Sequence, residues 1–440
     1  MGKLEKYSSY KDSGVEWLGE IPEHWELKPI KYLKKNIKNA FVDGPFGSSL
    51  KTEHFVQDGD VYVVESGFIT TGKFKYKDFK TITDKHFKTI QRSSCTQNDV
   101  IIAKIGANYG MAGELPKLDK KSVVSGNSLK ITLDDRVILN SIFVKLLESV
   151  KRLGGYNGIV NISAQPALSL GTLNNLRLPL PPKNEQTKIA SFLDEKTAQI
   201  DEVISQKEKL IELLKERKQI VINDAVTKGL NKNVEFVDSS VEWIGQIPKH
   251  WEIEKVKYIF KDSAIKNYGE EIPLAATQLY GVVPKDTLDY RTVEANVSDL
   301  NTFKLVKENN FVISLRSFEG GIEYSAYKGI ISPAYTVMEA LQDIAFKYFK
   351  YLFKSNIFIQ ALNIYKTGIR EGQNISFSKF KDDFLPLPPK NEQIEIAEYI
   401  ETQTTKIDKA IELQQNYISK LKEYKASLID SVVTGKVRVL

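Results

Sequence analysis

The sequence predicts an α/β protein with long helices: two compact α/β domains separated by an antiparallel two-helix coiled coil, in a chain related to itself by an internal pseudo-two-fold repeat. Three observations predict this fold. One segment occurs near the start of each half of the chain, a second segment recurs further along each half, and a long run without glycine or proline follows each second segment. At 440 residues the chain is long enough for two or three domains.

The first two observations are duplications. Residues 12–33 read DSGVEWLGEIPEHWELKPIKYL, and residues 238–259 read DSSVEWIGQIPKHWEIEKVKYI, an offset of 226. The second pair reads LPLPPKNEQTKIA from Leu178 and LPLPPKNEQIEIA from Leu385, an offset of 207. Because the ends of the two halves match and their middles do not, we interpret the chain as a duplication whose middles have diverged.

A long helix is predicted after each LPLPPKNEQ, over about 184–226 and 391–434. Prolines precede each run, and Gly229 and Gly435 follow where a helix commonly ends. Apolar residues recur at coiled-coil spacing in both runs, each 207 positions from its counterpart. The predicted coiled-coil residues are Leu193, Ile200, Ile204, Ile211, Leu214, Val221, Ile400, Ile407, Ile411, Ile418, Leu421 and Leu428.

Such an apolar stripe needs a partner, and the two copies supply one for each other. A helix of roughly 42 residues at about 1.5 Å per residue would be a rod near 60 Å long. A pseudo-two-fold relation makes the helices antiparallel and places the middles at opposite ends, so we interpret the pair as a spacer. The alternative is that each helix packs against its own globular domain.

The middles, residues 35–177 and 260–384, are predicted to be α/β domains. Strand-like runs at 61–65, 100–105 and 311–315 precede helical stretches near 139–153 and 344–365. The first middle has 20 Lys and Arg against 13 Asp and Glu, and the second has 15 against 15, in a chain of net charge +6. Any DNA contact by the second middle must therefore depend on local arrangement rather than on bulk charge.

Three loops, 43–51, 104–110 and 314–321, place small residues beside basic and aromatic ones. Glycine lets a backbone approach DNA closely, Arg or Lys can donate to guanine, and Asn can pair with adenine. Lysines nearby would hold phosphates without reading sequence. For each residue the alternative is an ordinary solvated surface position. The candidate DNA-contacting residues are Gly47, Ser48, Lys51, Lys73, Lys75, Arg92, Lys104, Asn108, Tyr109, Lys285, Arg316, Ser317, Tyr324 and Arg370.

No catalytic or metal-binding motif emerges from the residues. Four histidines and one cysteine are scattered without metal-ligand spacing, and no phosphate-binding GxxxxGK[ST] is present. His24 and His250 share one IPxHW context, so we interpret them as packing or docking residues rather than catalytic ones, and Trp25 and Trp251 as buried anchors. No apolar run reaches the roughly 18 residues of a membrane span, and a cytoplasmic location is expected.

The duplicated IPxHWE segment, the duplicated LPLPPKNEQ and the helix after each together resemble the specificity subunit of type I restriction–modification systems, over essentially the whole chain. The runs SLRSFEGGIEYS at 314–325 and GIISPAYT at 329–336 add to the resemblance. It implies two target-recognition domains, each reading one half of a split site in double-stranded DNA, with the coiled coil setting the gap. The implied segments are an N-terminal repeat segment 1–34, recognition domain 35–182, central helix 183–236, repeat segment 237–259, recognition domain 260–389, and C-terminal helix and tail 390–440.

The resemblance also implies partners. Two methyltransferase subunits would dock on the helices and methylate adenine with S-adenosylmethionine, and restriction subunits would cleave DNA with ATP and Mg²⁺. The chain itself would carry no cofactor, metal or catalytic residue. Two alternatives stay open: a coiled-coil adaptor that binds protein without reading DNA, and a self-sufficient DNA methyltransferase or nuclease.

Overall fold

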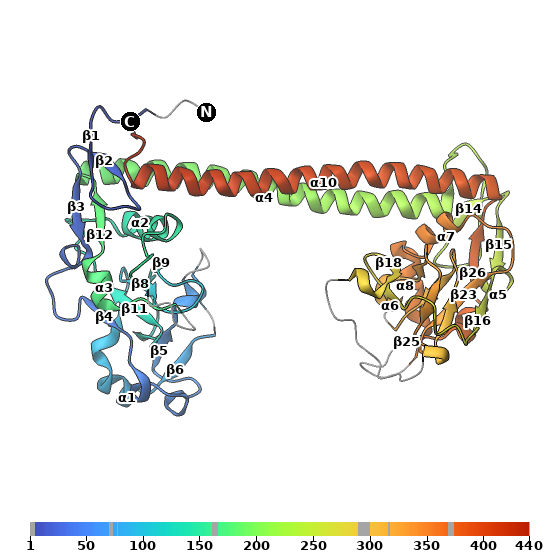
Figure 1. The fold of residues 1–440 in the computed structure, drawn as a ribbon, viewed down its shortest axis with the longest axis horizontal. Coiled ribbons are helices and arrows are strands. Elements are labelled where there is room, and N and C mark those ends of the chain that lie inside the picture. The colour runs from blue at the N-terminus through green and yellow to red at the C-terminus, as the bar shows by residue number, and fades with distance from the viewer. Residues whose placement is uncertain are drawn as a thin grey trace. The chain divides into compact units, whose positions relative to one another are not determined.

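The computed structural model describes residues 5–69, 74–76, 78–160, 166–288, 300–315, 317–367 and 374–439. The chain divides into two compact units, Met1–Ser205 with Tyr417–Leu440 (unit 1) and Gln206–Asn416 (unit 2). Each unit therefore contains one of the diverged middles and a part of each long helix (Figure 1).

Unit 1 combines short strands with helices. Its strands are β1 Tyr10–Asp12, β2 Glu20–Pro22, β3 Glu26–Pro29, β4 Phe41–Asp43, β5 Val61–Val64, β6 Lys80–Ile82, β7 Ser94–Cys95, β8 Val100–Ala103, β9 Ala112–Glu114, β10 Lys121–Val124, β11 Ser128–Ile131 and β12 Arg177–Leu180. Its helices are α1 Asp84–Thr89, α2 Asn140–Arg152, α3 Leu170–Asn175 and the first part of α4 Lys183–Lys228.

Unit 2 has the same mixture. Its strands are β13 Phe236–Asp238, β14 Gln246–Pro248, β15 Glu252–Lys255, β16 Phe260–Ser263, β17 Leu274–Thr277, β18 Gly281–Pro284, β19 Lys304–Val306, β20 Phe311–Ile313, β21 Glu323–Tyr324, β22 Gly329–Ile331, β23 Thr336–Ala340, β24 Lys366–Thr367, β25 Asn374–Ile375 and β26 Phe384–Leu387. Its helices are α5 Val256–Ile259, α6 Ser317–Gly320, α7 Phe346–Leu352, α8 Asn356–Leu362, α9 Phe377–Phe380 and the first part of α10 Lys390–Val433.

Each unit contains a four-stranded antiparallel sheet with equivalent strand order, β4-β11-β8-β9 in unit 1 and β16-β23-β20-β21 in unit 2. Their remaining strands differ. Unit 1 adds a sheet β6-β5-β10-β7 with one parallel pair, β5 and β10, whereas unit 2 has the two-stranded pairs β17-β18 and β19-β22. The predicted α/β character is confirmed, and the middles differ in structure as they do in sequence.

In each unit, the IPxHWE segment forms a two-stranded antiparallel sheet with the LPLPP segment. Strand β3 of the first segment pairs antiparallel with β12 of the LPLPP segment, with Glu26 opposite Leu180. In unit 2, β15 pairs with β26 in the same way, with Glu252 opposite Leu387. The sequence reveals both duplications, but this pairing between the two kinds of segment is visible only in the structure.

Both long helices form. Helix α4 spans Lys183–Lys228 and α10 spans Lys390–Val433, within a few residues of the predicted bounds. Each is followed by a glycine in the left-handed region, Gly229 at φ 68° and Gly435 at φ 79°, which side-chain-bearing residues rarely adopt. These conformations end the helices where the glycines stand.

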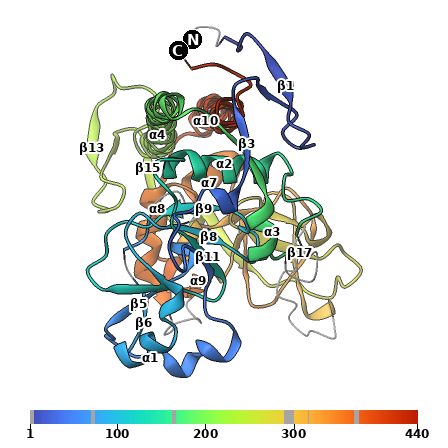
Figure 2. The ribbon, with the colours of Figure 1, turned by 90° about the vertical axis from the view of Figure 1, so that its left-hand side faces the viewer.

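Contacts between α4 and α10 occur inside each unit. In unit 2, Lys207 Nζ donates to Gln414 Oε1 at 2.9 Å and Lys218 pairs with Asp408 at 2.7 Å, so the two helices run antiparallel there. In unit 1, Lys425 pairs with Asp201 at 2.6 Å. Figure 2 shows the two helices side by side next to α2 in unit 1. None of the twelve predicted stripe residues is exposed: eight are buried, and Leu214, Ile407, Ile411 and Leu421 are half-buried.

The main core of unit 2 is aromatic. Phe260, Phe311, Phe349 and Phe353 are fully buried and meet edge to face or at a tilt, with ring centroids 5.1–5.8 Å apart. Such pairs contribute about 0.5–1.5 kcal/mol each beyond the area they bury. Among the described residues, no helix is both long and apolar enough to cross a membrane.

Candidate nucleic-acid interface

A carboxylate in the first turn of α4 joins this helix to the N-terminal repeat segment of unit 1. Glu185 accepts hydrogen bonds from His24 Nε2 at 2.6 Å, from Trp25 Nε1 at 3.1 Å and from Tyr7 Oη at 3.0 Å. Burial opposes ionisation of Glu185, but the hydrogen bonds from these three side chains outweigh it and lower the pKa of the carboxyl. Burial and the neighbouring carboxylate together raise the pKa of Tyr7.

Unit 2 repeats this arrangement. Glu392 accepts hydrogen bonds from His250 Nε2 at 2.6 Å and Trp251 Nε1 at 3.0 Å, without a tyrosine contact among the described residues. Trp25 and Trp251 are both buried, so their interpretation as anchors is confirmed. The His24 and His250 side chains are 47% and 43% exposed, so their interpretation as packing or docking residues stays a prediction.

The next residue of each KNEQ run also has a structural role. The Gln186 amide accepts from Leu139 N at 2.9 Å and donates to Pro181 O at 3.0 Å. Gln393 makes the equivalent contacts with Ala345 N and Pro388 O, both at 2.8 Å. Sequence reasoning did not assign roles to these glutamates and glutamines, although the repeated KNEQ was the signal that could have identified them.

In unit 1 the structure brings together two of the candidate DNA-reading loops. Lys104, just after β8, pairs with Asp43 at the end of β4 at 3.1 Å, and its ammonium lies 4.2 Å from the centre of the Phe46 ring. Loops 43–51 and 104–110 therefore form one continuous surface. The Lys104 side chain is only 12% exposed, so it holds these loops together and is not available to DNA as the sequence suggested.

Helix α2 supports the same surface from behind. Lys151 Nζ donates to Ala107 O at 2.6 Å and lies 4.7 Å from the centre of the Tyr109 ring. Helix α2 is also attached to α10, because Arg152 pairs with Asp430 at 2.7 Å. Sequence reasoning missed Lys151, since a lysine on a helix carries no signal of a contact with a distant loop.

The remaining candidate DNA-contacting residues fall into three groups. Those that are exposed in unit 1 are Gly47, Ser48, Lys51, Lys75, Arg92 and Asn108. Those that are half-buried are Tyr109, Lys285 and Tyr324. Those that lie outside the described residues are Lys73, Arg316 and Arg370.

The structure corrects the expectation for Ser317. Its side chain is 1% exposed, and its Oγ accepts a hydrogen bond from Ser314 N at 2.8 Å. A side chain so used cannot reach a base or phosphate. Tyr324 is also engaged, because its hydroxyl donates to Asn309 Oδ1 at 2.6 Å.

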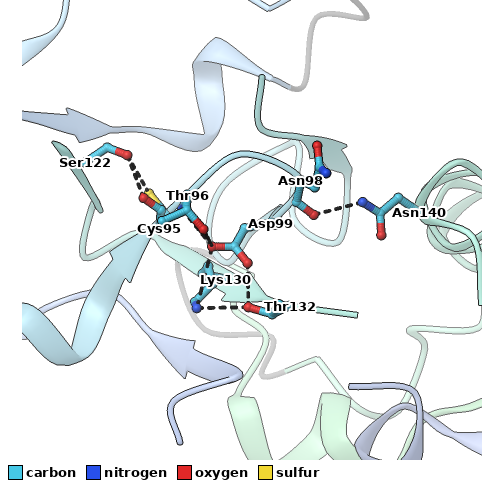
Figure 3. Close-up of polar contacts among 8 residues, drawn as sticks. All are labelled: Cys95, Thr96, Asn98, Asp99, Ser122, Lys130, Thr132 and Asn140. Atoms are coloured by element: carbon cyan, nitrogen blue, oxygen red, sulfur yellow. Dashed lines mark hydrogen bonds and ion pairs between the residues drawn. The ribbon is translucent and has the colours of Figure 1, made fainter. Parts of the chain in front are cut away.

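A cavity of about 460 Å³ lies beside the start of α2. Thr96 and Thr132 line this cavity, and both contact the buried Asp99, which is not part of the lining. Asp99 accepts from Thr96 N at 2.8 Å and from the Thr132 hydroxyl, and it pairs with Lys130 at 3.6 Å (Figure 3). The buried carboxylate is thus satisfied by structural contacts that join β8 to β11. The residues that the structure describes contain no group of three or more His, Cys, Asp or Glu side chains arranged to hold a metal.

Comparisons with known proteins find similarity to specificity subunits of type I restriction enzymes. Residues 30–213 match the family model of the type I restriction modification DNA specificity domain. The chain is 22% identical to the putative type I restriction enzyme MjaX specificity subunit of Methanocaldococcus jannaschii, covering 96% of each chain. It is 26% identical to the MjaVIII specificity subunit of that organism, over 95% of this chain and 94% of the relative. It is 22% identical to the EcoKI specificity subunit of Escherichia coli K12, over 95% and 90%.

Two solved structures share the fold. One chain, from a structure described as the basis of complex assembly and conformational transition of the type I R-M system, aligns with a TM-score of 0.63 at 12% identity, over 94% of this chain and 98% of that one. The HsdS subunit from Thermoanaerobacter tengcongensis aligns with a TM-score of 0.54 at 13% identity, over 95% and 98%. The sequence matches show that the chain is similar to type I restriction–modification specificity subunits over most of its length, and the solved structures show the same fold.

Proposed function

We propose that this chain is the sequence-specific DNA-binding subunit of a type I restriction–modification complex and reads a bipartite target through its two diverged domains. The observation that carries this proposal is the duplicated set of contacts between each repeat segment and the start of a long helix. His24, Trp25 and Glu185 in unit 1 make the same contacts as His250, Trp251 and Glu392 in unit 2, while the two domains differ in strand arrangement. Two different domains attached through equivalent contacts are suited to binding two different half-sites.

In this proposal α4 and α10 form the spacer between half-sites. A straight helix of 46 residues, the length of α4, spans about 69 Å. Two readers that each gain about 1–3 kcal/mol per good base contact become specific when one spacer holds them, because binding of the first raises the effective concentration of the second.

The same helices would dock two methyltransferase subunits. Within unit 2, Leu210, Leu213 and Ile220 of α4 are large apolar residues that remain exposed, spaced three and seven apart. This is the spacing of a second apolar stripe, which a partner helix could cover. S-adenosylmethionine would be bound by those subunits, and ATP and Mg²⁺ by restriction subunits. The assembled complex would then methylate adenine or cleave unmethylated sites.

Binding-site selection from random duplexes with the full chain tests the proposal. We expect two short half-sites separated by a constant unspecified gap, with affinity that falls steeply with salt. Exchanging residues 35–177 for the corresponding domain of a relative should change one half-site only. A chain that selects no sequence, and binds partners without DNA, would instead be the coiled-coil adaptor. Methyl transfer by the isolated chain would support the enzyme alternative.

A further inference from the structure

The turn between β17 and β18 in unit 2 is firmly fixed. The Thr277 hydroxyl accepts a hydrogen bond from Tyr280 N and donates one to Gly281 O, both at 3.0 Å. Gly281 has a φ of 76°, and a Cβ there would lie 2.8 Å from Tyr324 O. A side chain at this position would therefore be strained and would collide with β21.

This fixed turn presents two large side chains to solvent. Leu279 is 78% exposed and Tyr280 is 63% exposed. A single exposed apolar residue is ordinary, whereas two adjacent ones at the tip of a hydrogen-bonded turn form a small apolar patch on which a partner could pack.

A lysine joins this turn to the third candidate reading loop. Lys354 Nζ donates to Gln278 O at 3.3 Å in the turn and to Gly320 O at 2.7 Å in loop 314–321, and it pairs with Glu323 at 2.6 Å. An ammonium has three donors, and here each reaches a different segment. Glu323 is 1% exposed and lies behind the surface, whereas the Lys354 side chain is 26% exposed.

The two segments also touch directly. A Cβ on Gly320 would lie 2.6 Å from Gln278 Cγ, and a Cβ on Gly321 would lie 2.1 Å from Phe353 O. Gly321 needs glycine, because its φ is 82° and its close neighbour is backbone; α6 packs against α8 there, and Gly320 abuts the turn at Gln278 (Figure 1). Turn 277–281 and the described residues 314–315 and 317–321 of the loop are therefore one continuous surface, here named the composite tip.

We propose that the composite tip reads the second half-site, with Leu279 and Tyr280 as DNA-contacting residues and Lys354 as the positioning residue that holds the tip in shape. This inference rests on the proposed function. An apolar side chain can discriminate thymine by its methyl group, and apolar side chains can also wedge between base steps. Reading by shape and apolar contact fits a domain with 15 basic and 15 acidic residues. Unit 1 has a comparable support, since Lys151 donates to Ala107 O in its own reading loop.

The test is binding-site selection with the full chain carrying Leu279→Ala and Tyr280→Ala together. We expect the second half-site to lose base preference at one or more positions, with binding about five- to a hundredfold weaker, while the first half-site is selected as before. The control is Tyr258→Ala with Leu341→Ala, which removes the same residue types from exposed positions at the α5 end of the domain. The control should select both half-sites unchanged.

Lys354 is tested separately. Lys354→Met should relax the second half-site, and Lys354→Arg, which keeps charge and donors, should restore preference at least in part. A purely structural lysine would alter the urea midpoint without altering base preference. If the wild-type chain selects two half-sites and the Leu279/Tyr280 variant selects the same two with equal preference, the composite tip is not a reader. If the wild-type chain selects none, the proposed function itself has failed.

Discussion

The indole of Trp25 donates a hydrogen bond to Glu185, 160 residues further along the chain, at 3.1 Å. Trp251 and Glu392 repeat this contact at 3.0 Å in unit 2. Trp25 immediately precedes β3 and Trp251 immediately precedes β15, and each glutamate lies in the first turn of a long helix. The bond therefore ties the first turn of each long helix to the repeat segment of its own unit.

Replacing these glutamates should destabilise each unit. In Glu185→Gln or Glu392→Gln, an amide NH₂ takes the place of one acceptor oxygen, and we expect a loss of about 1–3 kcal/mol in the free energy of unfolding. The loss should be larger for Glu185, which also accepts from Tyr7. Urea denaturation followed by tryptophan fluorescence measures both. Tyr7→Phe should reduce the difference between the two positions, and equal losses in its presence and absence would contradict the role of the tyrosine.

Acid should weaken unit 1 through the same carboxylate. The pKa of Glu185 is lowered below its ordinary value of 4.5, so its stabilising contribution is present above that pH and is lost as the pH falls through the lower, folded value. Between pH 5 and pH 3 the wild-type chain should lose more stability than Glu185→Gln. Parallel curves for the two proteins would show that this carboxylate does not contribute.

Glu323 should have the opposite dependence. Burial raises its pKa from 4.5 to about 7, with the neighbouring Lys354 only partly compensating. Because its pKa is higher in the folded than in the unfolded chain, protonation of Glu323 stabilises the folded state. This contribution to the free energy of unfolding, about 3 kcal/mol at most, is fully present below pH 4.5 and is lost as the pH rises through 7. Glu323→Gln should flatten stability between pH 5 and pH 7.5 in thermal denaturation. A steeper dependence in the variant would contradict the raised pKa.

The stripe between the long helices should tolerate truncation poorly. Leu193 and Ile400 occupy equivalent, fully buried positions in the two units. Leu193→Ala and Ile400→Ala should each cost about 2–5 kcal/mol of unfolding free energy. Leu213→Ala is the matched control, because that leucine is half exposed and its loss should change stability by less than about 0.5 kcal/mol. If Leu213 belongs to the docking stripe, the control should instead weaken binding of a methyltransferase subunit in a pull-down.

Lengthening the helix pair should change the gap and leave the half-sites unaltered. Lys207 and Gln414 face each other, so one heptad inserted after each keeps the antiparallel stripe in register. Seven residues add about 10 Å, and the selected gap should grow by about three base pairs. A heptad inserted in α4 alone is the control and should impair folding. An unchanged gap in the double insertion would contradict the spacer.

The repeat segments and the long helices could largely be predicted from sequence because duplication makes them visible. Two copies of one segment identify each other, and periodic apolar residues such as Ile200 and Ile407 indicate a helix pair without knowledge of any contact. The residues that contact DNA bases are harder to predict from sequence than the helices are. Lys104 and Ser317 have residue types suited to DNA, yet the first is paired with Asp43 and the second holds a backbone amide. Residue type alone does not show whether a donor is already used.

By itself the sequence determined the duplication, the two long helices with their glycine ends, and the residues of the apolar stripe, because these follow from local spacing along the chain. Only the tertiary structure decided that β3 pairs with β12, that Glu185 accepts a hydrogen bond from Trp25, and that Lys354 joins two loops into one surface. Such contacts link positions tens to more than a hundred residues apart. They depend on how the chain folds back on itself, which no local pattern of residues specifies.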